Sequence, residues 1–196
     1  MPFTIVLLVG LLITAFFTGA YRADLSAQWM QKIGFAPNDL WLGRIEQMIL
    51  SAFFTDSPKS LIQALVMTAA SVGRSETVLG TERCMLVFFG IHILTLVILS
   101  LLIIWPLHFL KHPSGTSLAF VKDVGPSAGY FGCLGNLVFM LPGRFRLITV
   151  ISAMICLSVA FFIPAESNGK KWIKNHADLA HWIAFVLGVL YGRRVG

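Results

Sequence analysis

The chain has 196 residues, of which 57% are hydrophobic and 12% are charged, and its net charge is +6. A soluble globular domain of this length has too little interior to bury so much apolar surface, so the composition excludes an ordinary soluble enzyme and indicates a protein of the lipid bilayer. The basic residues are scattered through polar segments and form no clustered arm. We therefore expect no nucleic-acid partner.

Six apolar runs follow one another along the chain, at residues 2–19, 61–79, 84–105, 127–141, 147–164 and 177–191. A bilayer core about 30 Å thick needs roughly 20 mostly apolar residues in a helix. The runs show no alternation of polar and apolar residues, so they predict helices rather than barrel strands. The predicted fold class is all-α: a polytopic, multi-pass integral membrane protein whose six transmembrane helices form one domain over residues 1–196.

The first run has a second interpretation, because Thr18, Gly19 and Ala20 resemble the small-residue cleavage site of a signal peptide. No basic segment precedes the run, which favours a helix that is retained. Residues 21–60 follow it and carry tryptophans and phenylalanines among scattered charges. This mixture predicts an amphipathic loop region that lies in the membrane interface.

Cysteine and histidine spacing predicts neither a metal site nor a disulfide framework. Cys84, Cys133 and Cys156 lie in or beside apolar runs and lack the spacing of metal ligands, so we interpret them as packing residues. We expect no metal and no cofactor. An alternative from another functional class is a haem protein with His92 and His181 as axial ligands. A transporter is disfavoured, because the runs lack paired acidic residues.

The fourth run opens with the most informative segment of the chain. Its glycines Gly125, Gly129, Gly132 and Gly135 would let another helix approach closely, and Ser127 stands at its N-terminal end. On composition alone, this pattern is more typical of a packing seam with an incidental serine.

Ser127 and His181 are the polar pair that chain topology can bring together. The fourth and sixth runs enter the membrane from the same side, and each residue lies near the entering end of its run. A hydroxyl beside an imidazole is the minimal arrangement for nucleophilic catalysis, because the imidazole takes the proton as the oxygen attacks a carbonyl. Asp178, about one turn before His181, is the only carboxylate near in sequence, so a dyad rather than a triad is predicted.

At these residues the sequence resembles the rhomboid family of intramembrane serine proteases. The serine motif of that family has a glycine two residues before the serine, an aromatic residue four after it, and glycines five and eight after it. The matching positions are Gly125, Ser127, Phe131, Gly132 and Gly135.

Two further stretches carry the resemblance. Ala180 and His181, followed by Ala184 and Gly188, are similar to the family's last helix. Residues 73–80 are similar to its Gly-Arg-x-x-Glu-x-x-x-Gly element, with one residue fewer between the arginine and the glutamate.

The resemblance implies a role for each matching residue. Ser127 would be the nucleophile and His181 the general base of an endopeptidase that cleaves transmembrane protein substrates within the bilayer. Phe131 would pack on the imidazole, Gly188 would take part in a close crossing with the fourth helix, and Glu76 would hold loop structure.

The chain departs from the family pattern in two places. Ala128 replaces the glycine that follows the serine, and residues 60–64 replace the family's His-x-x-x-Asn element, whose side chains bind the oxyanion. Ser60 and Gln63 are the remaining oxyanion candidates near that position. Losing one such donor costs about 10²- to 10³-fold in rate. The alternative function is therefore a catalytically inactive rhomboid-like protein that binds transmembrane segments; oligomeric state and membrane orientation stay open.

Overall fold

Helices form the regular secondary structure of the computed structural model, which describes residues 1–162 and 171–195. The all-α prediction is confirmed. The long helices are α1 (Pro2–Thr18), α7 (Thr81–Ile98), α10 (Ser127–Leu137), α11 (Gly143–Phe162) and α12 (Lys171–Val195).

Three of the helical segments that contain apolar runs are built from consecutive elements. α5 (Pro58–Met67) continues through a π-helical turn, η2 (Thr68–Val72), into α6 (Gly73–Leu79). Likewise α7 continues through η3 (Leu99–Ile104) into α8 (Trp105–Phe109), and α10 ends in the 3₁₀ turn η4 (Val138–Met140). Each apolar run of the sequence thus lies in a helical segment, although the last two residues of the fifth run are outside the described residues.

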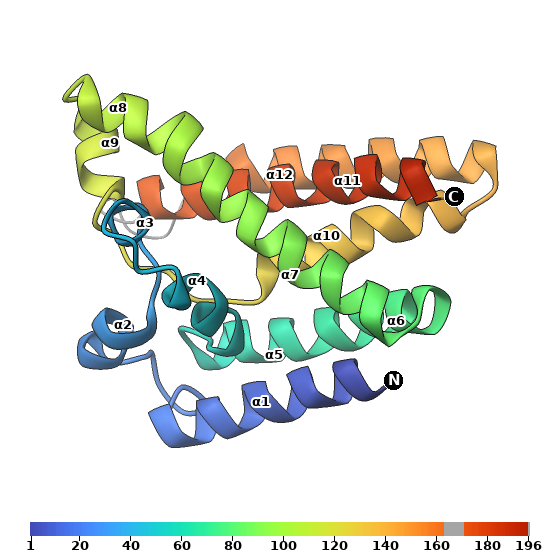
Figure 1. Ribbon diagram of the computed structural model, residues 1–196, viewed down its shortest axis with the longest axis horizontal. Helices are drawn as coiled ribbons and strands as arrows, with labels where there is room; N and C mark the ends of the chain where they lie inside the picture. The colour runs from blue at the N-terminus through green and yellow to red at the C-terminus, as the bar shows by residue number, and fades with distance from the viewer. Residues whose placement is uncertain (163–170, 196) are drawn as a thin grey trace.

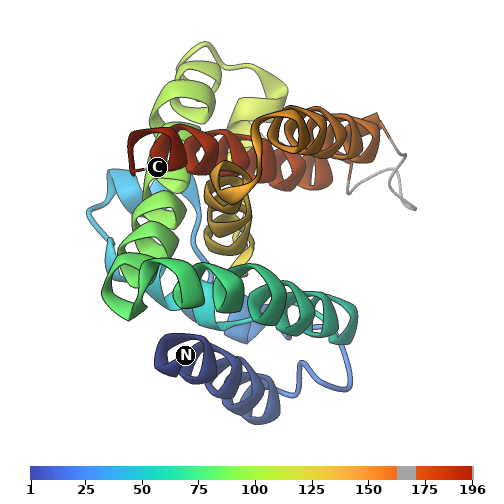
Figure 2. The same ribbon diagram turned by 90° about the vertical axis from the view of Figure 1, so that its right-hand side faces the viewer.

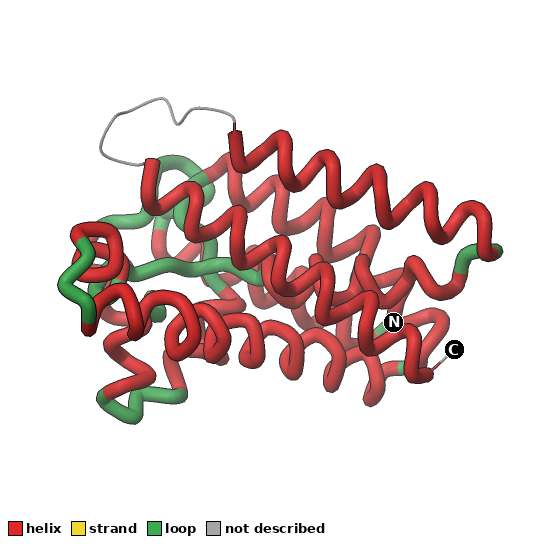
Figure 3. Tube along the Cα trace, turned by 90° about the horizontal axis from the view of Figure 1, so that it is seen from above, coloured by secondary structure: helices red, strands yellow, loops and turns green. Residues whose placement is uncertain are grey.

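The long helices lie side by side, and the two ends of this bundle differ in the length of their connections. α1 runs beside α5, α7 crosses the bundle obliquely, and α10, α11 and α12 lie on the other side of it (Figures 1 and 2). Seen from above, most of the long connections gather at one end (Figure 3). We call this end, with residues 19–57 and 110–126, the loop end. The opposite end has short turns at Gly80 and Pro142, and we call it the turn end.

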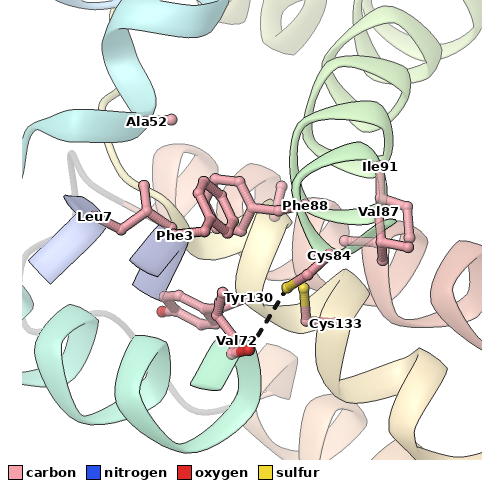
Figure 4. Packing of buried hydrophobic residues seen from close by; sticks show 12 residues of the cluster. Phe3, Leu7, Ala52, Val72, Cys84, Val87, Phe88, Ile91, Tyr130 and Cys133 are labelled. Atoms are coloured by element: carbon pink, nitrogen blue, oxygen red, sulfur yellow. Dashed lines mark hydrogen bonds between the residues drawn. The ribbon is translucent and has the colours of Figure 1, made fainter. Parts of the chain in front are cut away.

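A hydrophobic core joins α1 to the helices around it. Phe3 and Leu7 of α1 are buried against Phe88 of α7 and Val72 of η2, and the rings of Phe3 and Phe88 meet edge to face with centroids 5.6 Å apart (Figure 4). α1 is therefore an integral part of the folded core.

Glu76 fixes the first turn of α1 at the turn end. Its carboxylate accepts hydrogen bonds from the backbone N–H groups of Phe3 (3.0 Å) and Thr4 (2.8 Å), and from the hydroxyls of Thr4 (2.6 Å) and Thr81 (2.8 Å). The first N–H groups of a helix have no intrahelical acceptor, and a negative charge is favourable there. Glu76 thus connects the N-terminus of α1 to the start of α7.

Residues 21–60, predicted as an interfacial loop region, contain several short helices at the loop end. These are α2 (Ala27–Ile33), α3 (Pro37–Trp41), α4 (Glu46–Leu50) and η1 (Ser51–Phe53). α3 is held by the buried carboxylate of Asp39, which lies 2.6 Å from Lys122 Nζ and 3.6 Å from Arg44 Nη1. Lys122 follows α9 (Pro113–Leu118), so this ion pair ties residues 21–60 to the segment that leads into α10.

Within the described residues, one helical segment, Thr81–Phe109, is both long and apolar enough to cross a membrane by length and composition. Pro2–Thr18 and Ser127–Met140 are apolar but shorter. One such helix is weak evidence for a membrane protein, because the buried core helix of a soluble protein meets the same criteria. The bundle of six membrane spans stays a prediction.

Candidate functional site

The backbone before α10 places Ser127 at the start of that helix. Gly125 has a φ of +147°, which favours glycine, and its N–H donates to the carbonyl of Ser51 at 2.9 Å. Two residues earlier, Asp123 exchanges backbone hydrogen bonds of 2.9 Å with Phe35. Backbone hydrogen bonds from residues 21–60 therefore fix the segment 123–125, which leads into Ser127.

His181 lies on α12, which crosses α10 at backbone contact. A Cβ atom added to Gly188 would lie 2.1 Å from the carbonyl oxygen of Gly132, and one added to Gly135 would lie 2.2 Å from that of Phe185. Only glycine leaves room for such an approach between two helices. This crossing fixes the distance between the helix that carries Ser127 and the helix that carries His181.

The other side of α10 packs equally closely on α7. A Cβ atom added to Gly129 would lie 2.4 Å from the ring of Phe88, and one added to Gly132 would lie 2.6 Å from Ile91 Cγ2. α10 is thus fixed between α7 and α12, and the position of Ser127 follows from the packing of both.

Ser127 and His181 line one cavity of about 170 Å³ at the loop end. The ring of His181 is 4.6 Å from that of Phe131, centroid to centroid, and its Nδ1 is 4.0 Å from Asp178 Oδ1. In the part of the chain that the structure describes, no hydrogen bond joins the serine to the histidine. Catalytic hydrogen bonds are often long before substrate binds and shorten in the complex.

The two oxyanion candidates from the sequence both line this cavity, but they differ in their partners. The Ser60 hydroxyl donates a short hydrogen bond to Asp56 Oδ1 and accepts one from the N–H of Ser57 at 3.1 Å, as part of the cap of α5. Gln63 lines the cavity beside Tyr130 of α10 and has no part in that cap. Gln63 is therefore better placed than Ser60 to donate to an oxyanion.

Backbone donors are available at the same position. The N–H groups in the first turn of α10, at Ser127 and Ala128, have no acceptor within the helix. The positive end of the helix dipole adds to their attraction for a developing negative charge.

His92, the other histidine singled out in the sequence, is buried on α7. Its Nε2 lies 3.0 Å from the carbonyl oxygen of Met48 on α4, so it connects α7 to residues 21–60. This contact engages the nitrogen that a haem iron would need. Among the described residues, no group of three His, Cys, Asp or Glu side chains is arranged to hold a metal ion.

Sequence reasoning missed two carboxylates in the wall of the cavity, Asp56 and Asp123. Both lie outside the apolar runs, in segments that pattern alone leaves unplaced. The Asp123 side chain is open to the cavity and yet surrounded by protein atoms. Desolvation by these atoms and the nearby charge of Asp56 raise the pKa of Asp123 to about 6, against the opposing hydrogen bond from the N–H of Val124.

No protein-family model matches the chain, and no characterised protein or solved structure shows significant similarity to it. The residues of the site are therefore the basis on which its function is inferred.

Proposed function

We propose that this protein is a rhomboid-like intramembrane serine endopeptidase that cleaves transmembrane substrates with the dyad Ser127 and His181. The observation that carries the proposal is that these two side chains, from α10 and α12, line the same cavity. The ring contact between Phe131 and His181 and the backbone contact at Gly188 support it, because both are implied by the family resemblance.

The chemistry follows from the positions of the side chains. Ser127 Oγ attacks the carbonyl carbon of a peptide bond while His181 takes the hydroxyl proton. Because Nδ1 of His181 faces Asp178, Nε2 is the nitrogen that takes this proton. The histidine then gives the proton to the leaving amine as the C–N bond breaks, and water hydrolyses the acyl-enzyme. Phe131 keeps the imidazole from turning away from the serine.

Gln63 and the first-turn N–H groups of α10 are proposed to bind the oxyanion. Gln63 lines the cavity that holds Ser127, and the N–H groups belong to the first turn of α10, where Ser127 stands. Together they would supply the donors that the family's His-x-x-x-Asn element provides. Such donors act on charge that develops only as the bond is attacked, so they raise the rate rather than the affinity.

A multi-pass membrane bundle completes the proposal. Large apolar side chains are more than half exposed on α1, α7 and α11: Ile5, Val6, Phe16, Phe17, Leu86, Leu147, Ile148 and Ile155. Exposed apolar surface of this extent is unfavourable in water and is typical of a surface that faces lipid. We propose that all six helical segments lie in the bilayer and that the cavity lets water reach Ser127.

The inactive, segment-binding alternative is favoured by one specific observation. Ser127 and His181 share a cavity without a hydrogen bond between them in the described part of the chain, and the family's oxyanion element is replaced. A protein that only binds transmembrane segments needs neither that bond nor the oxyanion donors.

Cleavage in liposomes separates the two functions. The purified protein is reconstituted with a fluorescent transmembrane peptide, and products are separated by mass. We expect cleavage by the wild type and its loss in Ser127→Ala and His181→Ala. Ser158→Ala, a serine on α11 whose hydroxyl bonds the Met154 carbonyl, is the matched control and should keep full activity. Cleavage that survives Ser127→Ala would refute the assigned nucleophile, and an inactive wild type would favour the binding protein.

A further inference from the structure

The cavity beside Ser127 has an acidic wall. Asp56, just before α5, and Asp123, just before α10, both line it, whereas no lysine or arginine does so among the described residues. Both side chains are exposed where they line the cavity, so their charges are open to a ligand there. A cleft lined by charges of one sign attracts ligands of the opposite sign.

Each of these carboxylates has acceptor capacity left. Asp56 Oδ1 accepts from the hydroxyls of Ser57 and Ser60, and Asp123 Oδ1 accepts from the N–H of Val124 at 2.8 Å. Within the described ranges, neither carboxylate forms an ion pair with a lysine or arginine. Both contrast with Asp39 of α3, which is paired with Lys122, the residue before Asp123.

A third acceptor in the same wall is independent of the two acids. Thr55 is 3% exposed and lines the cavity, and its hydroxyl oxygen has no hydrogen-bond partner in the part of the chain that the structure describes. A buried hydroxyl without a partner is unfavourable. A ligand that brings N–H donors would satisfy it together with the carboxylates.

We propose that this cavity binds the cationic side chain of a lysine or arginine in the substrate, next to the peptide bond that Ser127 attacks. The inference rests on the proposed function, in that a transmembrane segment must enter the cavity. Lysine and arginine are common where a transmembrane segment meets water, and their long stems reach along apolar surface while the charged group seeks polar partners.

The size of the cavity fits one such side chain. Its volume of about 170 Å³ is many times the roughly 10–15 Å³ that a cavity needs to hold one water molecule. This is room for a long side chain but not for a helix. The substrate would therefore unwind locally and insert a single residue, with the cation against Asp56, Asp123 and Thr55.

A binding assay that needs no catalysis tests the inference. The Ser127→Ala protein in detergent micelles is titrated with fluorescent transmembrane peptides that carry either lysine or norleucine, its uncharged counterpart, at successive positions near one end. We expect the lysine peptide to bind ~10-fold more tightly at one register, which is the effect of one well-placed charge pair. Equal binding of both peptides at every register would overturn the inference.

Variants locate the effect. Asp56→Asn combined with Asp123→Asn should bring the lysine-to-norleucine ratio close to one, while Asp24→Asn, an exposed aspartate outside the cavity, should leave it unchanged. If Asp24→Asn lowers the ratio equally, net charge rather than the cavity explains it and the inference fails. Asp123→Lys should reverse the preference in favour of a glutamate peptide, which distinguishes a specific loss from misfolding.

The result is separable from that for the proposed function. Preferential lysine binding with an inactive wild type would refute the protease and keep the cationic subsite. Cleavage with no lysine preference would support the protease and refute the cationic subsite.

Discussion

The helices α10 and α12 pack closely toward one end of the bundle and line a polar cavity at the other. From the site toward the turn end, α10 and α12 meet backbone to backbone at Gly188, and at the turn end Glu76 accepts hydrogen bonds from the first turn of α1. At the loop end, the same α10 and α12 carry polar side chains and leave a cavity of about 170 Å³ between segments. The comparison indicates that close packing at one end fixes the spacing of Ser127 and His181 at the other.

The largest expected effect comes from filling the crossing. Gly188→Ala places a Cβ atom about 2.1 Å from a carbonyl oxygen of α10, and backbone cannot move aside as a side chain would. We expect the free energy of unfolding to fall by about 3 kcal/mol and cleavage to be lost. Gly90→Ala, on α7 with no atom within 4 Å of the added Cβ, is the matched control. Equal stability of the two variants, measured by denaturant titration in mixed micelles, would contradict the close crossing.

The next effect concerns the other contact at the turn end. Glu76→Ala leaves the N–H groups of Phe3 and Thr4 without their acceptor, and hydrogen bonds to a charged group contribute about 1.5–3 kcal/mol each. We expect a loss of about 2 kcal/mol in unfolding free energy and increased protease cleavage within α1. Glu82→Gln, an exposed acid at the start of α7, should change neither quantity. If protease cleavage within α1 is unchanged in Glu76→Ala, core packing alone holds this helix in place.

At the loop end, Gln63→Ala tests the oxyanion assignment. We expect kcat to fall about 10²-fold with little change in KM, because the donor acts on the transition state. Ser60→Ala should reduce kcat much less, since the hydroxyl of Ser60 is engaged with Asp56 and Ser57. If Ser60→Ala is the more damaging variant, the assignment is reversed.

The smallest effect is a pH dependence of cation preference. The pKa of Asp123 is raised to about 6, and only its ionised form attracts a cation, so the preference is present above that pH and is lost as the pH falls through it. The other titratable residues that line the cavities next to Asp123 are Asp56, His92, Tyr130, His176 and His181.

We expect the lysine-to-norleucine binding ratio to fall ~3-fold between pH 7.5 and pH 5, as one of two carboxylates is neutralised. The ratio cancels effects common to both peptides, whereas protonation of a histidine in the cavity would repel only the lysine peptide and is separated by the Asp123→Asn variant. Asp123→Asn should abolish the change, and a ratio that falls equally in that variant would assign it to another group.

The sequence was informative where a local pattern determines the structure. Long apolar runs predicted the helical segments, because apolar residues without turn signals favour continuous helix. The glycines of α10, with Gly188 from the family resemblance, predicted where two helices lie close together. These features depend on residues within one helix or on a known motif.

The parts of the fold and the site that the sequence did not predict depend on contacts between residues distant in the chain. The ion pair of Asp39 with Lys122, and the bridge from Phe35 to Asp123, join segments more than 80 residues apart, and no local pattern indicates such pairing. The preference for Gln63 over Ser60 as the oxyanion donor could have been predicted from the sequence. Ser57 and Ser60 flank the start of α5 at the spacing of a helix cap, a signal that would have assigned the Ser60 hydroxyl to the backbone.

The central claim, that Ser127 is a nucleophile activated by His181, is tested most directly by chemical labelling. The wild type, Ser127→Ala and His181→Ala are treated with a fluorophosphonate, and the adduct is located by mass spectrometry of the digested protein. The account predicts an adduct on Ser127 in the wild type, none in Ser127→Ala, and labelling at least ~10²-fold slower in His181→Ala. An unlabelled Ser127 in the folded wild type, or labelling at the same rate without His181, would contradict it.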